Sequence, residues 1–232
     1  MSISPQRILC AGLVGFWAFV LTGCAGTTTI LTAKFTSDTV GAPPSPTQTV
    51  GTVAVQAGAG SVLVATPPPG ASGNWVEISH PTRTTPETGL QGKFKDLNGN
   101  GTYGLLVALF IPTGCEVVTL QFESRLGSSY PSFLHLDFMP NNTVRIDDSS
   151  TTFGTFPRDK YFTVSVSLEV GSPMTKAHMQ LFGAGASGNL DYDVLPIFGS
   201  LPQQFAAVRF WMGYQWVGAF KVDDITVFYT QP

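Results

Sequence analysis

The chain has 232 residues, of which 43% are hydrophobic and only 12% are charged, and its formal net charge is −3. The charged fraction lies well below the roughly 25% of a typical soluble domain, and the scarcity of Lys and Glu argues against a mainly helical protein. The small negative charge provides no basic footprint for binding nucleic acid.

The first segment has the three-part pattern of an export signal. Residues 1–7 are short and polar, residues 8–21 are apolar, and Thr22, Gly23 and Cys24 follow. A permanent membrane helix needs about 20 apolar residues, so this shorter run is typical of a secretory signal. The run ends in Leu-Thr-Gly-Cys, which resembles a bacterial lipobox.

That resemblance implies cleavage before Cys24 and attachment of lipid to its thiol. Residues 1–23 are then a signal peptide, and residues 24–33, rich in Thr, are expected to be a loose lipidated tether. Two or three acyl chains suffice for stable anchoring. The lipobox implies a bacterial cell envelope, and Ala25 resembles the signal for the outer membrane where one exists. An ordinary secretory signal or an uncleaved anchor is the alternative.

The three cysteines allow no internal disulfide. Cys10 lies in the leader and Cys24 is assigned to lipid, which leaves Cys115 alone. We interpret Cys115 as a small buried apolar residue rather than a nucleophile.

Residues 34–232 are predicted to form one all-β domain. Apolar and polar residues alternate along residues 161–170, so that Phe162, Val164 and Val166 face a core while Thr163 and Ser165 do not. Further strands are predicted at residues 50–56, 61–65, 75–79, 90–95, 103–111, 116–123, 133–138, 143–146, 175–181, 205–212 and 220–229.

Turn sequences rich in Pro, Asn and Gly separate these strands. The pattern favours a two-sheet antiparallel sandwich. Residues 103–111 are apolar on both faces and are expected to form a central strand, and a change of phase at Asp223-Asp224 predicts a β-bulge.

The two ends of this domain carry a family resemblance. The ending Gly218-Ala-Phe-Lys-Val-Asp-Asp-Ile-Thr-Val227 resembles the last strand of bacterial concanavalin A-like (laminin-G-like) jelly rolls, and Phe35–Pro44 resembles their first strand. The resemblance implies that first and last strands pair. Galactose-binding-like jelly rolls share a similar last strand and are the alternative fold. Both groups include proteins of several functions.

No catalytic residue is assigned. Glucanases of the family that the chain resembles carry a Glu-x-Asp-x-Glu strand, and jelly-roll lyases carry an Arg, Gln-x-His and Tyr-Lys cluster. Neither pattern is present in this sequence. Asp191 and Asp193 would share one face of a strand, but the preceding Gly-Ala-Ser-Gly-Asn favours a loop. A retaining glycosidase needs two carboxyl groups about 5–5.5 Å apart.

No metal or other cofactor is assigned either. Residues 96–101 match the first half of a calcium loop, but Val107 stands where the bidentate glutamate belongs, so we interpret them as a turn rich in Asn-Gly. Asp38 and Asp224 would approach each other if the first and last strands pair. A structural calcium there is the alternative that we do not favour over two carboxylates accepting backbone N–H groups.

Two groups of residues are candidates for ligand binding. His135, Asp137, His178 and Gln180 project from the polar faces of their strands, and would line one concave groove if both strands belonged to one sheet. Trp211, Tyr214 and Trp216 surround a turn, where rings can stack on sugars or contact a partner protein. The alternatives are a solvated sheet face and rings that close one end of the sandwich.

From these observations we expect an extracytoplasmic lipoprotein that binds a glycan or an envelope protein without catalysis. The alternative is a carbohydrate-active enzyme, a glycoside hydrolase or polysaccharide lyase, of the same superfamily.

Overall fold

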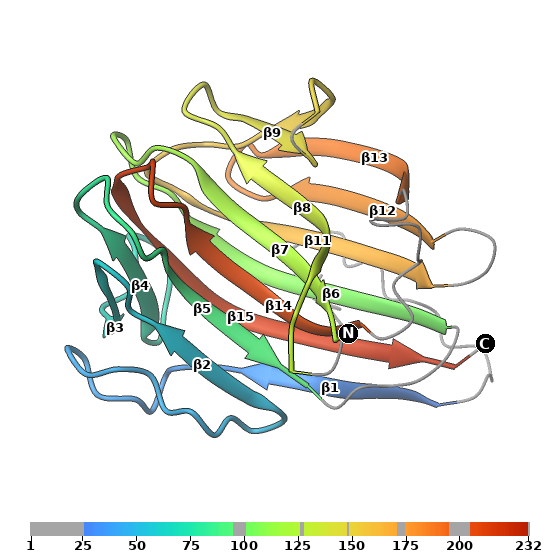
Figure 1. Cartoon of the computed structure of the whole chain (residues 1–232), viewed down its shortest axis with the longest axis horizontal. Helices are drawn as coiled ribbons and strands as arrows, with labels where there is room; N and C mark the ends of the chain where they lie inside the picture. The colour runs from blue at the N-terminus through green and yellow to red at the C-terminus, as the bar shows by residue number, and fades with distance from the viewer. Residues whose placement is uncertain are drawn as a thin grey trace, which may run out of the picture.

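The computed structural model describes residues 26–94, 101–125, 128–147, 149–170, 175–194 and 205–231 (Figure 1). Regular structure in these residues consists of antiparallel β-strands. The strands are Thr27–Ala33 (β1), Thr52–Gln56 (β2), Ser61–Ala65 (β3), Trp75–His80 (β4), Thr88–Lys93 (β5), Gly101–Phe110 (β6), Val118–Ser124 (β7), Ser132–Phe138 (β8), Thr143–Ile146 (β9), Thr152–Thr155 (β10), Tyr161–Val170 (β11), Thr175–Phe182 (β12), Ser187–Val194 (β13), Phe205–Met212 (β14) and Gly218–Thr230 (β15). The described part of the chain contains no helix with the length and hydropathy of a membrane span.

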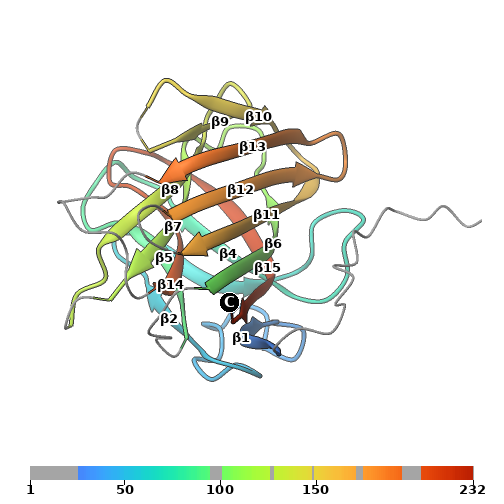
Figure 2. The same ribbon diagram turned by 90° about the vertical axis from the view of Figure 1, so that its right-hand side faces the viewer.

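The strands form two layers that are joined at one side. The front layer has the order β2-β5-β14-β7-β8-β9, and the back layer has the order β13-β12-β11-β6-β15-β4-β3. Strand β10 pairs with both β9 and β13 and so links the layers. The two layers overlie each other in Figure 1, and the ladder of the back layer is seen in Figure 2. The all-β two-layer sandwich predicted from the sequence is confirmed.

The core lies between the layers and is built by strict alternation. In β11, Phe162, Val164 and Val166 are buried, whereas Thr163 and Ser165 are only half-buried. Strand β6 pairs with β11 on one side and β15 on the other, which confirms the predicted central strand.

Strand β15 contains the predicted bulge. Its register against β6 shifts between Asp223 and Thr226, and Asp224 has a φ of 52°. The extra residue lets Val222 and Ile225 both enter the core.

The predicted pairing of first and last strands is also confirmed, but the first strand lies earlier than expected. Strand β1 covers residues 27–33 and pairs with β15 from Thr230 to Ile225. Leu31 and Ala33 are fully buried. The expectation of a loose tether up to residue 33 is therefore wrong, and so is the placement of the first strand at residues 35–44, which form turns. The run of Thr concealed a strand that is buried only in its second half.

Two predictions fall outside the described residues. The leader with Cys24 is one, and residues 96–100 of the suggested calcium loop are the other. Cleavage and lipid attachment at Cys24 stay predictions.

Candidate functional site

The outer face of the front layer carries large polar side chains. In β7, Leu120 and Phe122 enter the core, so that Thr119, Gln121 and Glu123 point away from it. The same alternation in β14 places Arg209 and Trp211 on that face, opposite Phe210 and Met212.

Strand register brings these side chains into rows across the sheet. Arg209 lies between Gln91 of β5 and Gln121 of β7, and Gln121 lies beside His135 of β8. In the next row, Trp211 pairs with Gly89 and Thr119, Thr119 with Asp137, and Asp137 with Arg145 of β9. We define the front-face site as Gln91, Lys93, Thr119, Gln121, Glu123, His135, Asp137, Arg145, Arg209 and Trp211.

One end of the front-face site is a network of charges around Asp137. Its Oδ1 accepts a hydrogen bond from the Thr119 hydroxyl at 2.7 Å, and its Oδ2 accepts one from Arg145 Nη2 at 3.1 Å. The His135 ring lies between two carboxylates, with Nε2 3.9 Å from Asp137 Oδ2 and Nδ1 3.4 Å from Asp147 Oδ1. Asp137 is almost fully buried, so this network fixes the side chains before any ligand arrives.

At the other end of the site, two cations are held over aromatic rings. The Arg209 guanidinium carbon lies 4.8 Å from the ring centre of Trp211, and Lys93 Nζ lies 5.1 Å from that of Tyr130. Glu123 accepts a hydrogen bond from Gln91 Nε2. Burial raises the pKa of Glu123 above its usual value, against the lowering effect of the Gln91 bond and of both cations.

Several buried polar atoms around Trp211 have no hydrogen-bond partner in the structure. They are the acceptors Gln56 Oε1 and Gln121 Oε1 and the donors Arg209 Nε and Trp211 Nε1. Gln56 joins this group because it pairs with Gly89, which in turn pairs with Trp211. Buried polar groups are nearly always hydrogen-bonded, so this cluster indicates a place where a polar ligand or ordered water belongs.

Gly89 lets the Trp211 side chain pack directly against the backbone of β5. A Cβ atom at this position would lie 2.7 Å from Trp211 Cβ and 2.7 Å from the carbonyl oxygen of Phe210. A larger residue at position 89 would therefore displace the indole.

The residues predicted for binding separate into two sets. His135 and Asp137 belong to the front-face site. His178 and Gln180 lie on β12, on the outer side of the back layer, and His178 Nδ1 contacts Asp191 Oδ1 at 2.6 Å. The condition for a common groove is not met, because β8 and β12 lie in opposite layers with the core between them (Figure 1).

The three rings near residue 213 also have different environments. Trp211 belongs to the front-face site, Tyr214 is half-exposed on the turn, and Trp216 is partly buried against the core. A Cβ atom at Gly213 would lie 3.3 Å from the Trp211 ring and 3.5 Å from that of Trp216. Both indoles therefore flank this glycine, and Tyr214 stands apart.

The acidic residues considered for calcium binding or catalysis do not come together around a metal site. Asp38 accepts a hydrogen bond from the backbone N–H of Ser45 at 2.9 Å, whereas Asp224 pairs with Lys34 at 3.0 Å. Asp191 and Asp193 share the exposed face of β13, which corrects the predicted loop. Among the described residues, no three His, Cys, Asp or Glu side chains come together as metal ligands.

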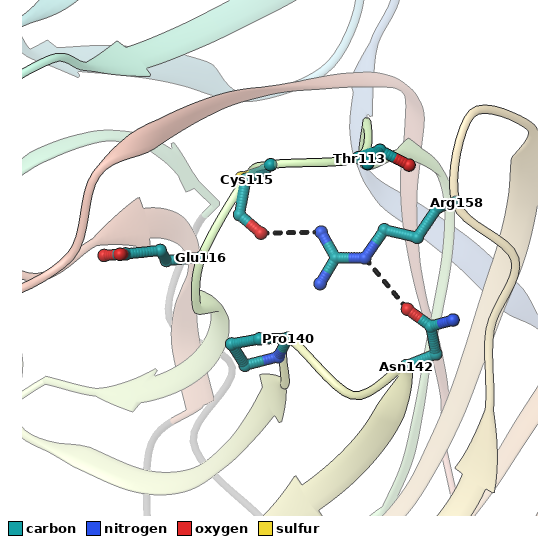
Figure 3. A pocket seen from close by; sticks show the side chains of 7 residues that line it. Thr113, Cys115, Glu116, Pro140, Asn142 and Arg158 are labelled. Atoms are coloured by element: carbon teal, nitrogen blue, oxygen red, sulfur yellow. Dashed lines mark hydrogen bonds between the residues drawn. The ribbon is translucent and has the colours of Figure 1, made fainter.

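A hollow of about 340 Å³ lies at one end of the sandwich, beside Cys115 and Arg158 (Figure 3). Arg158 donates hydrogen bonds to the carbonyl oxygens of Pro112, Cys115 and Met139 and to Asn142 Oδ1, at 2.7–3.0 Å. Four of its five N–H donors thus hold three loops together. Burial raises the pKa of Cys115 to about 11, so the thiol stays protonated and unreactive.

Sequence reasoning identified only part of the front-face site. It predicted a strand at residues 116–123 but gave no role to Thr119, Gln121 or Glu123, and it assigned no role to Gln91 or Arg209. The alternation of β7 was the available signal. The sequence does not reveal that β14 lies beside β7. This pairing joins residues that are about 90 positions apart in the chain.

No family model matches the sequence, and no curated protein is significantly similar to it. Solved structures do share the fold. Arcelin-5, a lectin-like defence protein from Phaseolus vulgaris, is 6% identical, with 89% of this chain and 99% of that chain covered and a TM-score of 0.52. Lectin I from Ulex europaeus, in complex with the methyl glycoside of α-L-fucose, is 12% identical, with 88% and 99% covered and a TM-score of 0.50.

A further similar structure comes from a phage. The CBM2 module of the evolved Dit protein of Lactobacillus casei phage J-1 is 14% identical, with 89% of this chain and 96% of that chain covered and a TM-score of 0.50. Together these likenesses establish a legume-lectin-like, concanavalin A-like β-sandwich. At such low identities they concern the fold alone.

Proposed function

We propose that this protein is a lipid-anchored, extracytoplasmic lectin-type module that binds a glycan on the outer face of its front layer. The observation that carries the proposal is the cluster of four buried, unpartnered polar atoms around Trp211. Leaving such atoms unpaired costs about 1–3 kcal/mol each. These atoms have almost no solvent contact, so their side chains must turn outward before a ligand can pair them and recover part of that cost.

Sugar chemistry fits this cluster. A sugar hydroxyl both donates and accepts hydrogen bonds, and the cluster offers donors on Arg209 and Trp211 and acceptors on Gln56 and Gln121. The Trp211 indole offers the apolar surface on which the C–H face of a sugar ring packs. The lectin and carbohydrate-module names of the structural neighbours add a fold-level analogy.

The spacing of the carboxyl groups favours binding over hydrolysis. Asp137 is opposite Thr119, which lies four residues from Glu123 along β7. At about 3.3 Å per residue, the backbone positions of Asp137 and Glu123 are therefore roughly 13 Å apart. Glycosidases place their two carboxyl groups about 5–9.5 Å apart. Asp137 and Asp147 are closer, but the His135 ring lies between them.

A glycan array with a soluble form lacking residues 1–24 tests the proposal. We expect binding to a defined set of glycans without release of reducing ends or unsaturated sugars. Trp211→Ala should lower affinity at least tenfold. Phe182→Ala, which removes an exposed ring from the back layer, is the matched control and should bind normally. Failure of the wild-type protein to bind any glycan, or turnover of one, would refute the proposal.

The lipid anchor is the second part of the proposal. If Cys24 carries the lipid, only Ala25 and Gly26 separate it from β1. The connection from Cys24 to the start of β1 spans at most roughly 10 Å. The end of the back layer where Thr27 pairs with Thr230 would then lie close to the bilayer. Labelled palmitate should enter the wild-type protein but not Cys24→Ser. Equal labelling of both proteins would rule out this attachment.

A further inference from the structure

Two cations of the front-face site have no carboxylate partner within salt-bridge distance in the described structure. Lys93 and Arg209 contact the rings of Tyr130 and Trp211, and neither forms an ion pair there. Lys93 pairs with Ala207 and Arg209 with Gln91, so the two cations are diagonal neighbours on adjacent strands. The backbone positions of such neighbours lie about 7–8 Å apart, so one bound sugar can span both side chains.

The nearest protein carboxyl group is engaged elsewhere. Glu123 accepts a hydrogen bond from Gln91 Nε2, and it acts on Arg209 and Lys93 only as a nearby charge. Glu87 is a second nearby negative charge on Arg209, so two carboxylates balance the two cations from a distance and neither is within salt-bridge distance of them. Arg209 Nε is buried without a hydrogen bond, and a guanidinium has no neutral form available to it. A buried guanidinium donor of this kind is costly unless an acceptor joins it.

We propose that the glycan bound at this face is acidic, and that a sugar carboxylate of the uronic acid type sits on Arg209 and Lys93 while its ring packs on Trp211. This inference rests on the proposed glycan binding. A planar carboxylate can accept two parallel hydrogen bonds from a guanidinium, and Lys93 adds a point charge. The neighbouring acceptor Gln121 Oε1 and donor Trp211 Nε1 remain for the hydroxyls of the same sugar.

Matched pairs of ligands test the carboxylate itself. The probes are hexamers of galacturonate, glucuronate and mannuronate, each compared with the same hexamer after its carboxyl groups are reduced to primary alcohols. Titration calorimetry of the soluble form should show at least one acidic hexamer binding tenfold or more tightly than its reduced partner. Raising the salt concentration should reduce that preference.

Variants assign the preference to the two cations. Arg209→Gln should remove most of the preference for the acidic form, and Lys93→Gln should reduce it severalfold. Lys176→Gln makes the same charge change on the exposed face of β12 and should leave binding unchanged. If Arg209→Gln fails to fold, Arg209→Lys keeps the charge but loses the parallel donors, and should still lower the preference severalfold.

The outcomes separate the two proposals. Equal binding of acidic and reduced hexamers, or binding of sulfated hexamers in preference to carboxylated ones, overturns the carboxylate assignment and leaves glycan binding intact. A preference for acid that Arg209→Gln does not change also overturns it. Absence of binding to these hexamers and to every glycan of the array overturns both proposals.

Discussion

The outer faces of the two layers are built by the same alternation but differ in character. On the back layer, Ser165, Ser167 and Lys176 are small or extend into solvent, and the side chain of Asp191 is 89% exposed beside His178. On the front layer, the side chain of Asp137 is only 7% exposed beside His135.

The difference shows that facing away from the core does not mean being solvated. Large polar side chains on adjacent front strands cover one another, so their hydrogen bonds form in a medium of low dielectric constant and their unpaired atoms are costly. The small side chains of the back layer leave groups such as the Asp191 carboxylate in contact with water. A histidine beside an aspartate therefore contributes to stability on the front layer and contributes little on the back layer.

The largest expected effect is the loss of the Asp137 carboxylate. Asp137→Ala removes the common acceptor of Thr119 and Arg145, and we expect it to lower the free energy of unfolding by about 3 kcal/mol. Asp191→Ala makes the same change on the back layer and should leave the urea midpoint unchanged. Similar losses from both variants would contradict the contrast between the faces.

Replacing a buried acid without adequate partners should raise the free energy of unfolding, the opposite of the effect at Asp137. Asp223, at the bulge of β15, is 4% exposed and its Oδ1 has no hydrogen bond. Burial raises its pKa to about 6, above the usual value of about 3.9. The folded state then binds more protons than the unfolded state between about pH 4 and 6, so this group stabilises the fold at low pH and its contribution is lost as the pH rises through that window.

Asp223→Asn should therefore stabilise the protein by about 2 kcal/mol at pH 7.5 and have little effect at pH 4. Urea unfolding at both pH values checks the sign. Asp224→Asn is the control, because that side chain is exposed and pairs with Lys34. A variant less stable than the wild type at pH 7.5 would show that the Asp223 carboxylate is well solvated or paired.

The fold was largely predictable because its signal is local. Strands β3, β9, β11 and β14 were predicted to the residue, and the bulge at Asp223 followed from a change of phase that a single segment displays. Strands β1, β10 and β13 were missed, and for β1 and β13 the reason is physical. Residues 27–29 of β1 are exposed, and the inward Leu190 and Tyr192 of β13 are only half-buried, so neither segment shows the full contrast that burial imposes.

The site was predictable only in part because it depends on strand order. Each row of the front-face site takes one residue from each of several strands, and the pairs that matter, such as Arg209 with Gln121, are distant in the chain. Alternation identifies which residues of one strand point away from the core. It does not identify which strand lies beside it, and this ambiguity led to the wrong pairing of His135 with His178.

A smaller effect is expected where binding and stability oppose each other. Gln121→Met replaces a half-buried side chain whose Oε1 is unpartnered by an apolar one of similar volume. We expect a gain of about 1 kcal/mol in unfolding free energy together with at least a fivefold loss of glycan affinity. Gln180→Met, in the corresponding position of the back layer, should change neither. A loss of stability at Gln121 would indicate that this amide serves the fold rather than a ligand.

The smallest expected effect concerns the back-layer residues that the sequence suggested for binding. His178 pairs with Asp191 on an exposed surface, and such pairs contribute about 0–1 kcal/mol. Because the core separates this surface from Trp211, the double variant His178→Ala, Gln180→Ala should change glycan affinity less than twofold and stability by less than about 0.5 kcal/mol. His135→Ala should lower affinity by a larger factor under the same conditions. A tenfold loss in the double variant would move the binding face to the back layer, and the unpartnered atoms of the front layer would then have to be satisfied by ordered water.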